Sequence, residues 1–211
     1  MSKLPASASA IRLVGEDLGC VRGGRNVFAG LSFSVAGGQA LIVSGPNGAG
    51  KTSLLRIVAG LLSAASGRIG LENADAERSV GEQSHYLAHQ DALKPSLSVS
   101  ENLQFWASYL GDQAVPVSAA LAAVDLDRLA DFPAGYLSAG QRRRLSLARL
   151  VTIKRPIWLL DEPTAALDVA GEARLSELMQ AHLGGGGIIL AATHGPLGLE
   201  PAGELTLGRS P

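Results

Sequence analysis

GPNGAGKT, residues 45–52, is the stretch of sequence that decides the fold. It follows a short apolar run, Ala40–Ser44, that suits a buried parallel strand, and it leads into a helical pattern over residues 51–62. Glycines at this spacing let backbone N–H groups close around a phosphate, and the N-terminus of the following helix faces the anion. The order of strand, glycine-rich loop and helix therefore predicts a P-loop, with a chance glycine-rich loop as the alternative.

The residues of this loop are candidate contacts to a bound nucleotide. Lys51 is expected to reach the β and γ phosphates. Thr52 places a hydroxyl where Mg²⁺ can be held, and Ser53 lies where it can meet the α phosphate. The full set of candidates is Gly45, Pro46, Asn47, Gly48, Ala49, Gly50, Lys51, Thr52 and Ser53.

Strand and helix patterns alternate on both sides of the loop. Before it, residues 11–18 and 27–35 are expected to be strands of a hairpin-rich opening, joined by a turn at residues 22–25. After it come a helical block over residues 99–129, apolar strands at 157–160 and 188–192, and a helix at 171–183 between those strands. This alternation predicts a parallel α/β core with a helical insertion.

The composition excludes several classes of protein. With 211 residues, 46% of them hydrophobic and 18% charged, the chain fits one α/β domain with a buried core. A net charge of −1 gives no reason to expect a nucleic-acid partner. The single cysteine, Cys20, excludes an internal disulfide and is expected to be a small buried side chain. Residues 1–10 lack the apolar core of a signal peptide, so the chain is expected to stay in the cytosol.

A second informative segment, residues 157–162, is an apolar strand that ends in two adjacent acids, Asp161 and Glu162. Nucleotides bind at the carboxyl ends of parallel strands. Asp161 is expected to assist Mg²⁺, and Glu162 is expected to polarise the attacking water as a general base. By itself the pair is equally typical of a capped turn, and the P-loop is what favours the catalytic interpretation.

A third segment, LSAGQ at residues 137–141, precedes a helical pattern, and Ser138 is a natural N-cap. A helix N-terminus with small residues can bind an anion, so a second phosphate half-site is expected here. Two half-sites in one chain suggest that two copies pair head to tail. The alternative is a simple serine-capped helix. The run Arg142-Arg143-Arg144 that follows is expected to be a solvated face.

Together these segments resemble the ABC ATPase family over nearly the whole chain. Residues 45–52 match its Walker A motif, 157–161 its Walker B motif and 137–141 its signature, in the family's order. The resemblance adds Gln90 as the Q-loop glutamine that touches Mg²⁺ and water, residues 166–168 as the D-loop, and His194 as the switch histidine at the γ-phosphate. Two positions depart from the family. Arg22 stands where an aromatic usually stacks on adenine, with Phe28 as the nearest aromatic, and Ala139 replaces a glycine.

The family resemblance has implications for fold and assembly. It implies a P-loop NTPase of α/β class with an antiparallel β subdomain, and a single domain over residues 1–211 in which a helical subdomain at about 91–150 is inserted in a RecA-like core. It implies a homodimer on ATP binding, in which two ATP molecules with Mg²⁺ lie between one copy's Walker motifs and the other copy's Ser138, Gly140 and Gln141. Integral membrane permease subunits would dock around residues 90–110, where Phe105, Trp106 and Tyr109 are candidates.

A narrower resemblance links the chain to the ATP-binding subunit of the cytochrome c biogenesis haem exporter. It rests on residues 18–22, 25–33, 89–90, 97–103, 137–141 and 193–197. It implies a peripheral ATPase at the cytoplasmic face of the bacterial inner membrane. The alternatives are an ATPase subunit that exports another small molecule, lipid or peptide, a soluble ABC protein of translation or DNA repair, and a binding module without turnover. Intact Lys51, Asp161, Glu162 and His194 argue against the last.

Overall fold

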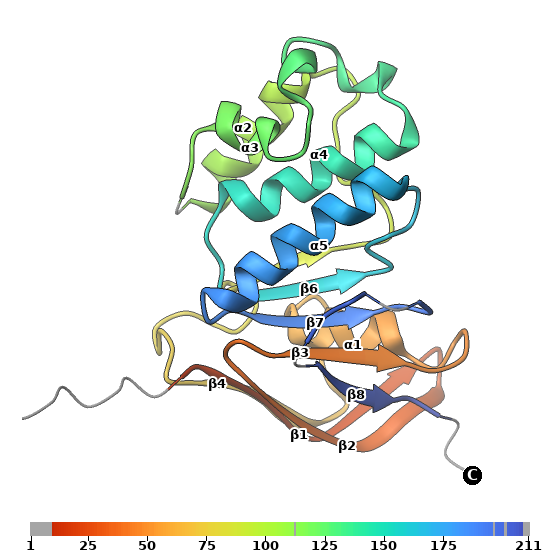
Figure 1. Ribbon diagram of the computed structural model, residues 1–211. Coiled ribbons are helices and arrows are strands. Elements are labelled where there is room, and N and C mark those ends of the chain that lie inside the picture. The colour runs from red at the N-terminus through yellow and green to blue at the C-terminus, as the bar shows by residue number, and fades with distance from the viewer. Residues whose placement is uncertain (1–9, 112, 196, 201, 209–211) are drawn as a thin grey trace, which may run out of the picture.

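The computed structural model describes residues 10–111, 113–195, 197–200 and 202–208 (Figure 1). Its centre is a five-stranded sheet in which all neighbouring strands run parallel, as the alternating pattern predicts. In spatial order the strands are β5 Ser84–Leu87, β6 Ile157–Asp161, β7 Ile188–Ala192, β3 Ala40–Ser44 and β8 Ala202–Thr206.

A second, antiparallel sheet lies against the first and has the strand order β2-β1-β4. Its members are β1 Arg12–Arg22, β2 Arg25–Ala36 and β4 Ser66–Glu72. β1 and β2 form the predicted hairpin, and the turn between them contains Gly23 and Gly24, both with positive φ. Cys20 is buried in this sheet, as predicted. The predicted α/β fold with an antiparallel sheet is confirmed.

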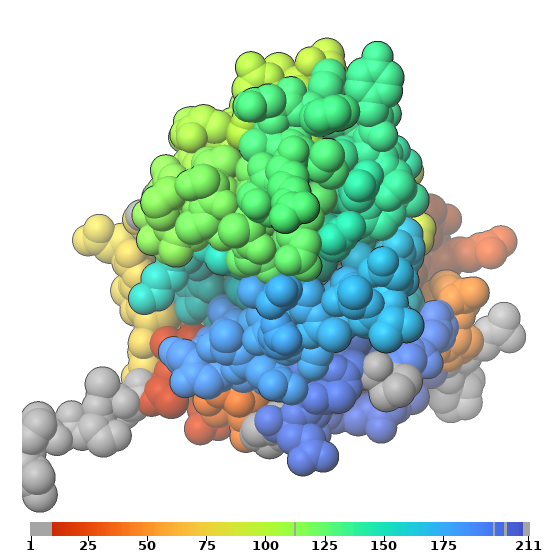
Figure 2. All heavy atoms as spheres, turned by 45° about the horizontal axis from the view of Figure 1, so that its top comes forward, coloured from red at the N-terminus to blue at the C-terminus, as the bar shows by residue number. Residues whose placement is uncertain are grey.

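Helices cover both faces of the parallel sheet. Figure 1 shows α1 between the two sheets and the remaining helices on the opposite face, and in Figure 2 the green residues of the helical block form one continuous mass beside α5. The helices are α1 Lys51–Val58, α2 Val99–Leu110, α3 Val117–Ala122, α4 Ala139–Thr152 and α5 Val169–Gly184, with 3₁₀ turns η1 Asp127–Leu129 and η2 Ala134–Tyr136.

Strand β6 shows why this layering forms. All five of its residues are buried, which is typical of a parallel strand covered on both faces. Ile157 and Leu159 pack with α1 and the antiparallel sheet, whereas Trp158 and Leu160 pack in the core that contains α4 and α5. The side chains of one short strand therefore join two hydrophobic cores, and Asp161, at the end of the strand, is buried.

The structure differs from the sequence patterns in a few places. Helix α1 ends at Val58 and not at residue 62, because Gly60 adopts a φ of 71° and turns the chain. Helix α5 begins at Val169, two residues before the predicted start, because the Asp168 side chain caps it. Strands β4, β5 and β8 are additions to the predicted set.

Within the described residues, every helix is too short or too polar to span a lipid bilayer. Parts of the predicted assignments lie outside the described residues: positions 1–9, 112, 201 and 209–211 of the single domain, of which 112 is also in the predicted helical block, and Pro196 within the 193–197 segment.

Candidate functional site

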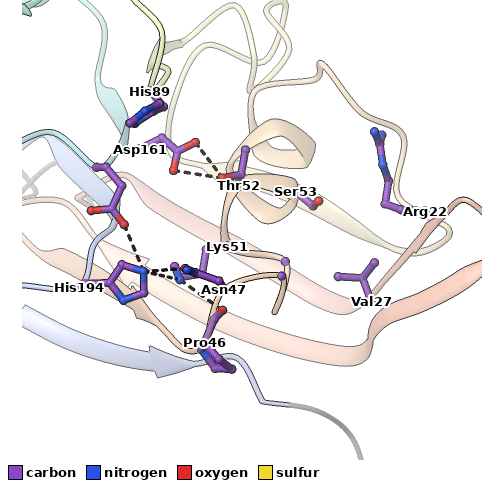
Figure 3. Close-up of a pocket in the computed structure, with 13 residues that line it drawn as sticks. Arg22, Val27, Pro46, Asn47, Lys51, Thr52, Ser53, His89, Asp161 and His194 are labelled. Carbon is purple, nitrogen blue, oxygen red and sulfur yellow. Dashed lines mark hydrogen bonds and ion pairs between the residues drawn. The ribbon is translucent and has the colours of Figure 1, made fainter. Parts of the chain in front are cut away.

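A pocket of about 430 Å³ lies at the carboxyl edge of the parallel sheet, where β3, β6 and β7 end (Figure 3). This is the edge at which open α/β sheets bind ligands. Three loops that are far apart in the sequence contribute to the pocket: the P-loop after β3, the acidic pair after β6 and His194 after β7. The lining residues are Arg22, Val27, Pro46, Asn47, Gly48, Gly50, Lys51, Thr52, Ser53, His89, Asp161, Glu162 and His194.

The P-loop takes a shape that requires glycine. Gly50 precedes α1 with a φ of 105°, and a Cβ built there would lie 2.6 Å from a Val27 side-chain carbon. The first turn of α1 contains no acidic residue and Gly50 provides no side-chain cap, so its N–H groups are suited to an anion. The Lys51 ammonium is largely buried and donates to the Gly45 carbonyl oxygen at 2.7 Å.

Side-chain oxygen atoms that could coordinate a metal ion lie close together on one side of the pocket. The Thr52 hydroxyl donates to the two carboxylate oxygens of Asp161 at 2.9 and 3.2 Å. The Tyr86 hydroxyl also donates to Asp161, at 3.4 Å, and burial raises the pKa of this phenol. Among the described residues no group of three or more histidines, cysteines and acids forms a metal cluster. One carboxylate and one hydroxyl fit Mg²⁺, which takes its other ligands from water and substrate phosphates.

Glu162 and His194 face each other across the pocket. The Glu162 Oε1 atom lies 3.6 Å from His194 Nε2, and the same nitrogen lies 3.1 Å from Asn47 Oδ1 and 3.2 Å from Lys51 Nζ. Figure 3 shows the imidazole turned towards Lys51 and Asn47. Glu162 has a φ of 46°, an unusual backbone conformation for a non-glycine residue, and such strain often accompanies functional sites.

Arg22 and Phe28, the two residues considered for stacking on the adenine, differ in exposure. Arg22 is exposed and lines the pocket, where its guanidinium plane is available to stack on a base. Phe28 is 6% exposed and packs in the core beside Gly50, and it lines a neighbouring cavity together with Arg22, so its role as a substitute for the missing adenine-stacking aromatic stays a prediction.

The structure does not bring every predicted residue into the pocket. Gln90 is exposed and lines a separate groove of about 360 Å³, whereas its neighbour His89 lines the pocket itself. The signature residues at the start of α4 also lie outside the lining set. There the Ser138 side chain accepts from the Gln141 N–H at 3.2 Å, and the Gln141 side chain accepts from the Ser138 N–H at 2.8 Å. Ser138 is therefore the predicted N-cap, within a capping box.

The expectation that residues 142–144 form a solvated face is wrong for the middle arginine. Arg143 is 2% exposed, and Arg142 and Arg144 are half-buried. Arg143 points inward because it lies one helical turn before Ser146 and Leu147, which are also buried. The burial of Arg143 was not predicted, although its spacing from the apolar positions of α4 was an available signal.

Two neighbouring aromatic side chains of α2, Trp106 and Tyr109, line the groove beside Gln90, and Phe105 lies next to them outside its lining. Tyr109 is 72% exposed and Phe105 39%, and their rings stack with centroids 6.1 Å apart. Trp106 packs edge-on against both, and the Arg149 guanidinium lies 4.5 Å from the centroid of its ring. Rigid aromatic side chains of this kind are enriched at protein interfaces.

This fold and pocket define a P-loop nucleotide-binding protein, and comparison with known proteins specifies the family. Residues 28–165 match the family model described as ABC transporter. A putative ABC transporter (ATP-binding protein) from Pyrococcus furiosus has the same fold, with a TM-score of 0.79 at 24% identity, over 93% of this chain and 97% of that one. A bacterial Atm1-family ABC exporter with ATP bound has a TM-score of 0.78 at 23% identity, over 99% of this chain and 39% of that one.

Sequence relatives are much more similar than these structures. The chain is 61% identical over 198 residues to the cytochrome c biogenesis ATP-binding export protein CcmA of Nitrobacter winogradskyi, covering 94% of this chain and 98% of the relative. It is 54% identical over 199 residues to the protein of the same name from Mesorhizobium japonicum, with the same coverage. The chain belongs to the ABC transporter family, within the group of cytochrome c biogenesis ATP-binding export proteins.

Proposed function

We propose that this chain is the ATP-hydrolysing, energy-coupling subunit of a bacterial ABC transporter for haem export and c-type cytochrome biogenesis. One observation carries the proposal: the chemical groups needed for ATP hydrolysis converge on one pocket from the ends of three adjacent strands. The identity of 61% to a cytochrome c biogenesis ATP-binding export protein supports the proposed role in c-type cytochrome biogenesis.

Each group has a role in the proposed hydrolysis. Lys51 and the P-loop N–H groups hold the β and γ phosphates. Thr52 and Asp161 hold Mg²⁺, which when bound neutralises charge on those phosphates. Glu162 takes a proton from the attacking water while the γ-phosphorus forms a bond to that water oxygen and loses its bond to the bridging oxygen of ADP. His194, which already lies 3.2 Å from Lys51, contacts the γ-phosphate.

The remaining site residues complete the proposal. Arg22 stacks on the adenine, as its place at the pocket supports. Two copies pair on ATP binding, so that Ser138, Gly140 and Gln141 of one copy meet the nucleotide of the other. Gln90 borders the adjacent groove, and it would contact Mg²⁺ and the attacking water if its loop moved towards the neighbouring pocket.

Membrane permease subunits are the proposed partners of the groove that contains Gln90, Trp106 and Tyr109. The exposed Tyr109 ring beside the half-buried Trp106 supports a protein partner, and the position of the groove next to the His89–Gln90 loop lets docking and hydrolysis communicate. The chain would then lie at the cytoplasmic face of the inner membrane. We further propose that residues 1–211 are one domain, with residues 91–150 as its helical insertion.

The replacement Glu162→Gln tests the hydrolysis mechanism. It keeps the size of the side chain and removes the base, so the purified chain should bind Mg²⁺ and ATP, form a stable dimer in gel filtration, and lose at least about 100-fold in turnover. Glu172→Gln, on an exposed part of α5, is the matched control and should behave as the wild type. Wild-type turnover by Glu162→Gln would refute the base assignment, and absence of turnover by the wild-type chain and its complex would refute the function.

A further inference from the structure

Arg143, in the second turn of α4, is a buried charge whose bonding is unusually complete. Its side chain is 2% exposed. Nε donates to the Pro163 carbonyl oxygen at 3.3 Å. Nη1 donates to the Ala88 carbonyl oxygen at 2.7 Å and to Asp91 Oδ1 at 3.4 Å, and Nη2 donates to the carbonyl oxygens of Asp161 at 3.1 Å and Glu162 at 2.8 Å. A guanidinium has five N–H donors, and each has an acceptor here.

These acceptors belong to two loops that leave neighbouring parallel strands. One segment, residues 161–163, runs from the last residue of β6 into the following loop and carries the proposed metal-holding Asp161 and the proposed base Glu162. The other loop, residues 88–91, carries His89, which lines the nucleotide pocket, and Gln90, which lines the aromatic groove. The helix that bears Arg143 begins at the signature segment. One planar side chain thus joins the base, the Gln90 loop and the signature helix.

The contact with Glu162 bears on the direction of its carboxylate. Glu162 holds a φ of 46°, which a non-glycine residue keeps only when its surroundings fix it. Its N–H donates to the Ala192 carbonyl oxygen at 2.8 Å, and its own carbonyl oxygen accepts from Arg143 at 2.8 Å. The backbone of the base is therefore held on both sides, which aims the side chain at His194.

Charge balance allows the guanidinium to stay buried. Asp91 is the acidic partner, and it also accepts from the Ser146 hydroxyl at 2.9 Å. Burial lowers the pKa of Arg143, and Asp91 acts against that shift. A lysine at this position could keep the charge, but its single ammonium could not span two loops, since arginine and lysine differ in the reach and geometry of their donors.

We infer that Arg143 is a positioning residue for ATP hydrolysis, which sets the backbone of Glu162 and couples it to the Gln90 loop. The inference rests on the proposed function of Glu162. Arg143 is not among the residues that line the nucleotide pocket, so it acts on turnover and not on ATP affinity.

The test compares Arg143→Lys and Arg143→Gln with Arg144→Lys in the full chain. Arg144 is the matched control because it lies on the same helix and its Nη1 donates only a long, 3.4 Å bond to the Val124 carbonyl oxygen. Measurement of kcat, KM and the Kd for a fluorescent ATP analogue, over a range of protein concentrations, separates chemistry from binding and from pairing. For both Arg143 variants we expect kcat to fall about 10- to 100-fold while KM and Kd change less than about threefold. Arg144→Lys should match the wild type.

A double-mutant cycle identifies the residue through which Arg143 acts. In the Glu162→Gln background, Arg143→Lys should reduce the residual hydrolysis by less than about threefold, because the base that it positions is already gone. An unchanged kcat, a further loss of tenfold in that background, or a parallel loss of ATP binding and turnover in both variants would overturn the inference. Absence of turnover by the wild-type chain would instead refute the proposed function.

Discussion

His85 makes the stability of this protein sensitive to acid. The imidazole lies in β5 with 2% exposure, and its Nε2 atom is 2.8 Å from the Ile153 carbonyl oxygen. That contact requires a proton on Nε2 and is available to the neutral ring. The pKa of His85 is lowered to about 3, and burial of the imidazole is the largest of several causes. The folded protein therefore keeps this histidine neutral under conditions where an unfolded chain protonates it.

The pH window follows from the two pKa values. The unfolded chain binds a proton at His85 below pH of about 6.5, and the folded chain does so only near pH 3. Above pH 6.5 the residue has no effect on the pH dependence. Between pH 6.5 and 3, each unit of acidification lowers the free energy of unfolding by about 1.4 kcal/mol, so the loss at pH 5 is about 2 kcal/mol. His182, whose burial lowers its pKa to about 4, adds a similar loss.

Denaturant unfolding at pH 7 and pH 5 measures this effect. His85→Gln keeps an N–H donor for Ile153 and cannot be protonated, so the variant should lose about 2 kcal/mol less than the wild type between the two pH values. His89→Gln is the control, because His89 is exposed, and it should follow the wild type. The reasoning is refuted if His85→Gln loses as much stability on acidification as the wild-type protein does.

Three further predictions concern the nucleotide and the partner. Gly50→Ala should weaken ATP binding at least about tenfold in a fluorescence titration, because the added Cβ meets a side chain 2.6 Å away at a φ of 105°. Arg22→Ala should weaken ATP binding about two- to fivefold through loss of stacking, whereas Arg25→Ala, outside that pocket's lining, should not; equal effects would contradict the stacking role. Tyr109→Glu should abolish co-purification with the permease, whereas Phe132→Glu, at an aromatic that is 54% exposed and outside the groove, should preserve it; retention in both would exclude the groove as the docking surface.

The parts of the fold and site that could be predicted from the sequence are those specified by a pattern of contiguous residues. The P-loop is one such part, because its glycines, its lysine and the strand and helix around it lie within a single local pattern. Strand β6 is another, since an apolar run followed by Asp161 and Glu162 specifies both its burial and its end. In these segments local geometry decides the structure.

Tertiary pairing decides the segments that the sequence did not predict. Strand β8 pairs with β3, and the Ser44 hydroxyl meets the Glu204 carboxylate across 160 positions of sequence, a distance at which no local pattern operates. Arg143 was missed for a different reason. Three consecutive arginines are by composition typical of a solvent-exposed surface. The helical spacing of Arg143 from Ser146 and Leu150 instead predicts a buried position, and Arg143 is buried in the structure.

The most direct test of the proposed function is haem staining of c-type cytochromes in source cells whose only copy of this chain carries Glu162→Gln. A wild-type copy is the control, and immunoblots of the apocytochromes and assays of cytosolic haem proteins accompany the stain. The account predicts loss of covalent haem from c-type cytochromes while the apoproteins and the cytosolic haem proteins remain. Normal c-type cytochromes in these cells would contradict it and would leave an ABC ATPase that serves another cargo.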